Sequence, residues 1–217
     1  YQPTSNVGPD FTEYYGSKFG SYTYQSWLHE IGHALGLGHT GNYNGKGDYD
    51  RDALFSNDSW QMSVMSYFSQ TENTSINASR AFVLTPMPGD IAAIQRIYGD
   101  IGSPGEGNTT YFWNTNAAGI HGTIGRQIAA GTLKGPFALT IMDSSGVDTL
   151  DFRGSTKALA LDLAPGAIGS AFGLRGNILI ERETIIENVV ATKADDLVTG
   201  QDAHNKMFGR QGDDRLY

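Results

Sequence analysis

The sequence predicts an α+β protein in which a helix-containing part, residues 1–100, is followed by an all-β part, residues 101–217, that ends as a parallel β-roll or β-sandwich. Three observations support this fold class. Two amphipathic segments have helical spacing, the chain then changes to short apolar runs divided by turn residues, and the last 27 residues form three nine-residue repeats.

The first predicted helix contains the apolar residues Leu28, Ile31 and Leu35. Thr23 and Ser26 are candidates for its N-cap, and Gly36 or Gly38 is expected to end it after about 12 residues. Residues 1–22 have the composition of turns and short extended pieces.

Residues 39–82 are polar and predict a long irregular loop, which is usually functional or an insertion. The second helix follows this loop. Pro88 lies near its first turn, Asp90 follows, and Gly99 gives a stop signal. Its apolar stripe consists of Ile91, Ile94 and Tyr98.

A run rich in Gly and Pro, residues 99–108, marks the expected boundary between the two parts. Beyond it, short segments of β-branched or alternating apolar residues predict strands at 137–141, 149–152, 158–163, 178–181 and 184–190.

The three repeats cover 191–199, 200–208 and 209–217. Their sixth residues are Asp196, Asn205 and Asp214, and their eighth residues are Val198, Met207 and Leu216. This pattern is typical of a β-roll in which a six-residue turn faces a calcium ion and the eighth side chain points into the core.

The composition narrows the possible functions. A net charge of −8 argues against nucleic acid as a partner and favours cations. The absence of cysteine excludes disulfides and thiolate ligands. No stretch approaches the roughly 20 apolar residues of a membrane span.

A metal-binding pattern occupies the first helix, where the sequence from His29 to His39 is HEIGHALGLGH. Two histidines four residues apart, His29 and His33, share one helix face and can chelate one zinc ion. Gly36 can turn the chain so that His39 reaches the same ion. Glu30 lies off the ligand direction, as expected for a general base that takes a proton from a zinc-activated water.

Chance occurrence of histidines in a buried helix is the alternative interpretation, and five fixed positions out of eleven (His, Glu, His, Gly, His) argue against it. The other two histidines, His121 and His204, have no such neighbours and are expected at the surface.

The segment SVMSY contains Met65, which lies 26 residues after His39, and Tyr67. Together with the extended histidine motif it resembles the metzincin endopeptidases, in which a methionine turn lies under the zinc site. Tyr67 and the nonapeptides narrow this resemblance to the serralysins. The resemblance implies that Met65 packs beneath the histidine ligands. It also implies that Tyr67 is a further zinc ligand that moves to hydrogen-bond the tetrahedral intermediate. The likeness runs from about Trp27 to Tyr217.

The resemblance also implies three calcium sites. The first would use carbonyls of Gly105, Gly107, Thr109 and Ser145 with carboxylates of Asp143 and Asp148. The second would use carbonyls of Gly146 and Ile185 with Asp148 and Glu187. The third would use Thr192, Ala194, Asp196, Gly209, Gln211 and Asp214.

Four turn positions carry side chains where the family pattern has glycine: Ser145, Thr192, Ala194 and Arg210. A left-handed backbone at each would cost about 1 kcal/mol, which makes the third site the weakest expectation.

These features predict a secreted, extracellular zinc endopeptidase that cuts internal peptide bonds of proteins, with Zn²⁺ in the site and Ca²⁺ stabilising the β-roll. Only 22 residues precede the helix, so the chain is expected to be a fragment without the N-terminal subdomain and the C-terminal end, and to associate with the missing N-terminal portion. The alternative is an inactive calcium-binding or scaffold fragment. An astacin-like or matrixin-like metzincin would have no β-roll, and residues 191–217 argue against it.

Overall fold

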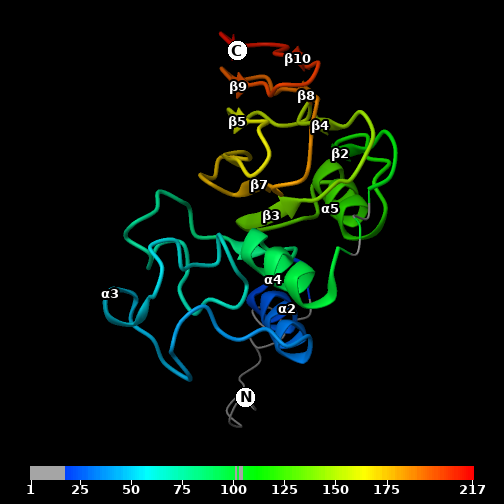
Figure 1. Ribbon diagram of the computed structural model, residues 1–217. Helices are drawn as coiled ribbons and strands as arrows, with labels where there is room; N and C mark the ends of the chain where they lie inside the picture. The colour runs from blue at the N-terminus through cyan, green and yellow to red at the C-terminus, as the bar shows by residue number, and fades with distance from the viewer. Residues whose placement is uncertain (1–17, 101, 103–104) are drawn as a thin grey trace.

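A computed structural model describes residues 18–100, 102 and 105–217 of the chain. Most of the turn segment expected at 1–22 lies outside these residues. Helices α2 (Tyr22–Ala34), α3 (Tyr49–Asp52) and α4 (Pro88–Tyr98) occupy one end of the molecule, and stacked strands occupy the other (Figure 1).

Helix α2 confirms the first predicted helix but begins earlier than expected. Its N-cap is Ser21, whose hydroxyl accepts a hydrogen bond from the backbone N–H of Tyr24 at 3.2 Å. Thr23 and Ser26, the expected caps, both lie inside the helix, and the Ser26 hydroxyl donates to the Tyr22 carbonyl instead. After the helix ends, Gly36 takes a left-handed φ of 91°, which supports its expected role in turning the chain.

Helix α4 matches the prediction at both ends. Pro88 is its first residue, and Gly99 follows its last residue with φ 84°. Asp90 and Ile91 are its buried residues, so this helix presents both a carboxylate and an apolar side chain to the interior.

Eleven strands are found in the described part of the chain: β1 (Phe82–Val83), β2 (Thr110–Phe112), β3 (Phe137–Ile141), β4 (Thr149–Asp151), β5 (Ala160–Asp162), β6 (Ile168–Gly169), β7 (Ile178–Ile180), β8 (Asn188–Val190), β9 (Leu197–Thr199), β10 (Lys206–Phe208) and β11 (Arg215–Leu216). They form sheets of order β1-β3-β7-β6, β10-β8-β4-β2 and β11-β9-β5. All neighbouring pairs are parallel except β6 with β7.

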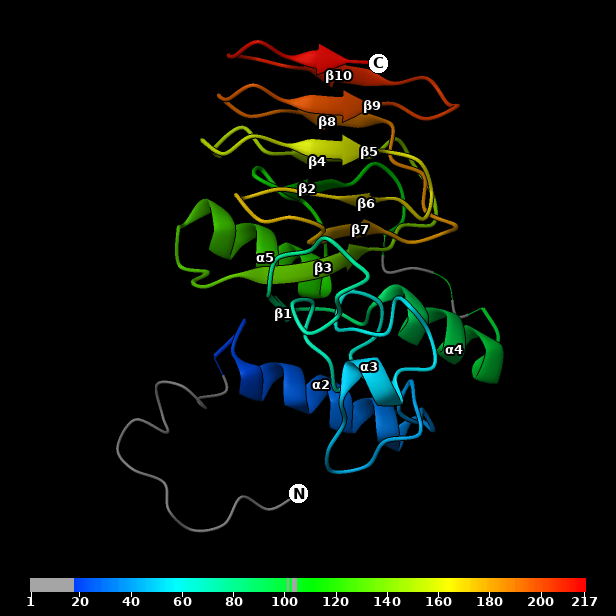
Figure 2. The same cartoon turned by 90° about the vertical axis from the view of Figure 1, so that its left-hand side faces the viewer.

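The nonapeptides form successive parallel strands, as the repeat predicts, and Figure 2 shows them stacked as the outermost layers. Register joins positions 18 residues apart: Leu197 pairs with Arg215 and Asn188 with Lys206. Consecutive repeats therefore lie on opposite sheets. Val198 is fully buried between them, whereas Leu216 is 38% exposed on the outermost strand.

The expectation that the second part is all-β is wrong, because helix α5 (Gly119–Ala129) covers β2. Its three glycines hide the helix from sequence reasoning, since glycine is a poor helix former. Packing explains two of them. A Cβ on Gly122 would come within 2.1 Å of the Ala117 carbonyl oxygen, and one on Gly125 within 2.6 Å of the Phe112 carbonyl oxygen.

The same helix corrects the expectation for His121, which is buried, with 7% of its surface exposed. Its ring packs edge-on against Tyr111 at a centroid distance of 5.4 Å. His204 is exposed, as predicted.

The two parts of the chain share a sheet and a core. Strand β1 pairs with β3 across the expected boundary, and the side-chain amide oxygen of Gln25 in α2 accepts from the N–H of Val83 in β1 at 3.0 Å. Leu179 of β7 packs in the same cluster as Met65. Within the described residues, no helix combines the length and apolarity needed to cross a bilayer.

Candidate metal centres

Three histidine side chains converge where α2 ends and the following loop returns. One ligand nitrogen from each of His29, His33 and His39 lies within 4.8 Å of the other two, and no other such group of His, Cys, Asp or Glu is found among the residues that the structure describes. Helical spacing brings His29 and His33 together, and the turn at Gly36 brings back His39.

Hydrogen bonds orient all three imidazoles in the same way. The Nδ1 atoms of His29, His33 and His39 lie 2.8, 2.9 and 2.9 Å from the carbonyl oxygens of Val64, Leu37 and Tyr43. A carbonyl can only accept, so each Nδ1 must carry the proton and each Nε2 keeps a free lone pair.

Two of these lone pairs face each other, with 3.1 Å between Nε2 of His33 and Nε2 of His39. Two neutral acceptors cannot hydrogen-bond, so this approach fits rings that share a cation. Burial, followed by the neighbouring imidazoles, lowers the pKa of His39, and this favours the neutral form that binds metal. Three neutral nitrogen donors suit zinc.

Met65, the residue predicted to lie under the zinc site, is buried and 1% exposed. It packs against Gly32 of α2, where an added Cβ would lie 2.4 Å from the Met65 Sδ atom. Gly32 is thus a site residue that sequence reasoning missed. Its position between the two helical histidines is the signal that could have identified it.

Asp90 is a second missed residue, and it holds the turn that carries Met65. Its carboxylate accepts from the Ser63 hydroxyl at 2.6 Å and from the Val64 N–H at 2.9 Å. The N–H of Met87 donates to the same group at 2.8 Å. Burial raises the pKa of Asp90, against the effect of these three donors. Because Val64 also accepts from His29, Asp90 orients a histidine through the turn.

Tyr67 and Glu30 lie beside the histidines in different settings. The Tyr67 ring is 4.5 Å from the His39 ring, centroid to centroid, and its hydroxyl accepts from the N–H of Gly45 at 3.2 Å. Glu30 is exposed on α2, next to His29.

The residues expected at the first calcium site lie in two facing turns. Gly105 lies against Asp143, since a Cβ there would come within 2.3 Å of the carboxylate. Thr109 donates its N–H to the Asp148 carboxylate at 2.7 Å, and Ser145 donates its N–H to Asp143 at 3.2 Å. Between the two turns, the carbonyl of Gly107 lies opposite Gly146.

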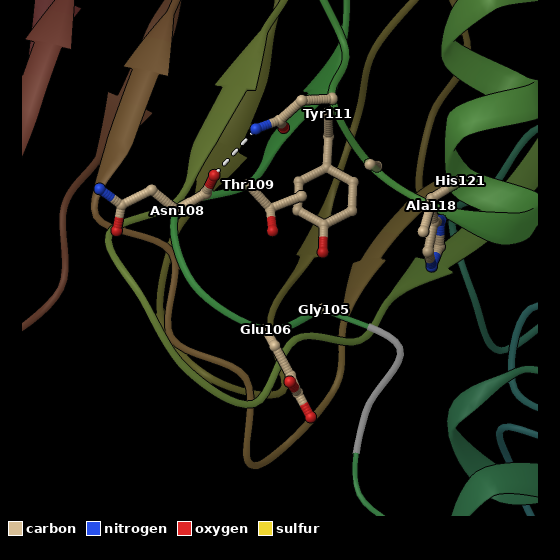
Figure 3. A pocket seen from close by; sticks show the side chains of 9 residues that line it. Gly105, Glu106, Asn108, Thr109, Tyr111, Ala118 and His121 are labelled. Carbon is tan, nitrogen blue, oxygen red and sulfur yellow. Dashed lines mark hydrogen bonds between the residues drawn. The ribbon is translucent and has the colours of Figure 1, made fainter.

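Tyr111 is a further missed residue of this region. Its hydroxyl donates to Asp143 at 2.5 Å, and it is 2% exposed. Figure 3 shows Tyr111 and His121 on one side of a hollow whose other side is formed by the loop of Gly105, Glu106 and Asn108.

The second expected site shares Asp148 with the first. The Asp148 N–H donates to the Glu187 carboxylate at 2.7 Å, which brings these two residues together. Burial, followed by the charges of Asp143 and Glu187, raises the pKa of Asp148 to about 6. Gly146 lies in the same turn with φ 129°, and Ile185 lies two residues before Glu187 with its side chain exposed.

The third expected site lies between two repeats. Asp196 is 2% exposed and accepts from the N–H of Thr192 at 2.8 Å, and its own N–H donates to Asp214 at 3.0 Å. The turns face each other, since a Cβ on Gly212 would meet the Ala194 carbonyl oxygen at 2.5 Å. Gly209 lies against the Asp214 carboxylate, and Gln211 is exposed.

The backbone strain expected in these turns is found at one position. Arg210 has a φ of 77°, whereas Ser145, Thr192 and Ala194 are not among the residues with positive φ. The prediction of a left-handed cost is therefore wrong for these three residues. Each lies in a part of the turn whose backbone any residue can adopt.

The molecule therefore combines three converging histidines, two on α2 and one in the loop after it, with a parallel β-roll rich in carboxylate turns. Comparison with known proteins identifies the family. A family model described as "Peptidase M10 serralysin C terminal" matches residues 106–215. The chain belongs to the serralysin family.

Known relatives are identical to this chain at about one third of the aligned residues. Metallopeptidase AprA of Pseudomonas marginalis is 34% identical over 94% of this chain and 45% of its own length. Serralysin C of Dickeya chrysanthemi is 36% identical over 89% of this chain and 38% of its own length. Serralysin of Photorhabdus luminescens is 34% identical over 86% and 38% respectively. The chain thus spans less than half the length of these relatives.

Proposed function

We propose that this chain carries the zinc site of a secreted endopeptidase that hydrolyses internal peptide bonds of proteins. The observation that supports it best is the shared orientation of three histidines, each with Nδ1 on a backbone carbonyl. In this proposal residues 1–100 are the zinc-binding part of a metzincin domain, and residues 101–217 are the first part of a calcium-binding β-roll.

The histidines His29, His33 and His39 would hold the zinc, which when bound supplies Lewis acidity that polarises a carbonyl and lowers the pKa of water. Glu30 takes the proton of the attacking water and gives it to the leaving amine. Tyr67 would be a further zinc ligand, and its hydroxyl would donate a hydrogen bond to the carbonyl oxygen that gains negative charge when water attacks.

Calcium would stabilise the β-roll through the three turn sites. The turn that carries Asp143 and Asp148 faces the turn that carries Gly105 and Gly107, so carboxylates lie near a backbone carbonyl, and both are ligands that calcium prefers. Sites of this kind fill where calcium is plentiful, which favours folding outside the cell.

Helix α2 has an exposed apolar face that supports a partner for the zinc-binding part. Trp27, Ile31 and Leu35 follow one another at four-residue spacing and are 61%, 51% and 41% exposed. Such a stripe normally packs against other protein. The proposed occupant is further polypeptide of the same protease, which would also help to bind the protein substrate.

The test of the proposed base is Glu30→Gln. This variant should retain one zinc per chain and lose protein hydrolysis, because the amide has the shape of the carboxylate but cannot take a proton. Glu183→Gln, at an exposed carboxylate in the β-roll part, is the matched control and should retain both properties. Unchanged turnover in Glu30→Gln would refute the assignment. Zinc content near zero with calcium retained would favour the alternative, a calcium-binding scaffold without catalysis.

A further inference from the structure

A buried carboxylate, Asp58, lies beneath the loop that carries His39. Asp58 is 3% exposed. Its Oδ1 atom accepts from the hydroxyl of Thr40 at 2.5 Å and from the hydroxyl of Ser66 at 2.6 Å. The Tyr43 hydroxyl donates to the same carboxylate at 3.1 Å. Three hydroxyl donors from two separate segments thus meet on one acceptor.

One of these segments orients a histidine. Thr40 directly follows His39, and the Tyr43 carbonyl is the acceptor for the His39 Nδ1 proton. The Tyr43 ring also stacks on the His39 ring, with centroids 5.8 Å apart and planes 23° apart. Fixing Thr40 and Tyr43 from below therefore fixes the direction of His39 Nε2.

The other segment is the methionine turn. Ser66 lies between Met65 and Tyr67, and its hydroxyl reaches Asp58. Tyr67 in turn lies with its ring 4.8 Å from that of Tyr43. A single carboxylate thus sets the spacing between the His39 loop and the turn that carries Tyr67.

Asp58 is itself held rigidly. The Asn73 side chain donates to the Asp58 carbonyl at 3.1 Å, and the Trp60 indole N–H donates to the Ser66 carbonyl at 3.0 Å. These contacts tie the segment around Asp58 to the methionine turn by a second route. The carboxylate is therefore a fixed point and not an adaptable surface charge.

From this geometry we infer that Asp58 is a positioning residue for the metal site, acting on His39 through Tyr43 and on Tyr67 through Ser66. The inference rests on the proposed function, since it assigns Asp58 to the zinc site of that function. Outer-shell groups of this kind normally fix the orientation of a metal ligand, and their removal weakens metal binding by about 10- to 100-fold.

The experiment measures zinc affinity of the full chain by competition with a coloured chelator, for wild type and Asp58→Asn. We expect the zinc dissociation constant to rise about tenfold in the variant. Asp50→Asn changes an exposed carboxylate in α3, between the His39 loop and Asp58, and should match wild type. Cobalt bound in place of zinc reports geometry, so its visible absorption should change in Asp58→Asn alone, while calcium affinity of the β-roll stays the same.

Each outcome has one meaning. Failure of wild type to bind zinc would reject the proposed function before any variant is compared. Equal zinc affinity and equal cobalt spectra in wild type and Asp58→Asn would overturn the inference and leave the proposed function intact. If Asp58→Asn does not fold, Tyr43→Phe and Thr40→Val decide, since each removes one hydroxyl donor from Asp58. Wild-type zinc affinity in both would overturn the inference equally.

Discussion

Gly32 lies between two proposed zinc ligands in α2, and a single methyl group added there tests how closely the methionine turn packs under the helix. In Gly32→Ala the new Cβ would lie 2.4 Å from Met65 Sδ and 3.5 Å from Met65 Cε. Met65 is 1% exposed, so its thioether has little room to move. The helix or the turn must shift to relieve the contact.

Two effects of opposite sign set the magnitude. Alanine is favoured over glycine inside a helix by about 1 kcal/mol. Overpacking a filled core costs about 1–3 kcal/mol. The substitution should therefore lower the free energy of unfolding by up to about 2 kcal/mol. In a Met65→Ala background the contact is absent, and the same substitution should instead raise the free energy of unfolding by about 1 kcal/mol.

Urea unfolding of wild type, both single variants and the double variant measures this change of sign. Gly38→Ala, at a glycine with no atom within 4 Å of its added Cβ, is the control and should change stability by less than about 0.5 kcal/mol. Equal stabilisation by Gly32→Ala in both backgrounds would show that Met65 is not packed against the helix and would refute the reasoning.

Three further predictions concern the β-roll part. Burial lowers the pKa of His121 to about 4, so the unfolded chain binds a proton first as pH falls, and stability should drop between pH 6.5 and 4 by on the order of 3 kcal/mol. His121→Leu should flatten that slope in urea unfolding; an unchanged slope would contradict the neutral imidazole. The pKa of Asp148 is raised to about 6 from 3.8, so without calcium its stabilising contribution is present below pH 3.8 and lost as pH rises through 6. This pH dependence has the opposite sign to that of His121, and Asp148→Asn should remove it. The stabilisation by added calcium should be larger than this contribution. Gly146→Ala would place a Cβ 2.2 Å from the Gly107 carbonyl oxygen at φ 129°. Its unfolding temperature should fall further than that of Gly131→Ala, whose added Cβ meets no atom within 4 Å. Equal falls in unfolding temperature would refute the steric reason.

Sequence patterns predicted the helices and strands that are determined by their own residues and by those next to them. Helix α2, helix α4 and strand β3 follow from side-chain periodicity and from Pro and Gly at their ends. The histidine triad follows in the same way, since the spacing of two ligands on a helix determines their direction. Helix α5 escaped prediction because two of its glycines are required by close contacts with earlier segments, Gly125 with Phe112 of β2 and Gly122 with Ala117.

The groups that orient the histidines escaped prediction for a different reason. Asp58 is 18 residues from Thr40, and Asp90 is 26 residues from Val64. An aspartate in a polar loop has the same local pattern whether its carboxylate is solvated or buried under a metal site. Gly32 differs, because it lies between two histidines on the helix, and this position indicates that another segment packs closely on that face.

The shared core joins the two proposed metal systems thermodynamically. Helix α2 contacts β1 through Gln25 and Val83, β1 pairs with β3, and Asp143 lies two residues beyond the end of β3. Calcium that binds only the folded β-roll stabilises it by RT ln(1 + [Ca²⁺]/Kd), and an element that shares its core unfolds with it. Added calcium should therefore raise the unfolding temperature of the zinc-binding part as well as that of the β-roll. Two variants with a single tryptophan would be followed by fluorescence. One keeps only Trp60, in the first part, and the other keeps only Trp113, in the second. A Trp60 transition that stays at the same temperature while the Trp113 transition rises with calcium would show that β1 and β3 do not couple the two parts.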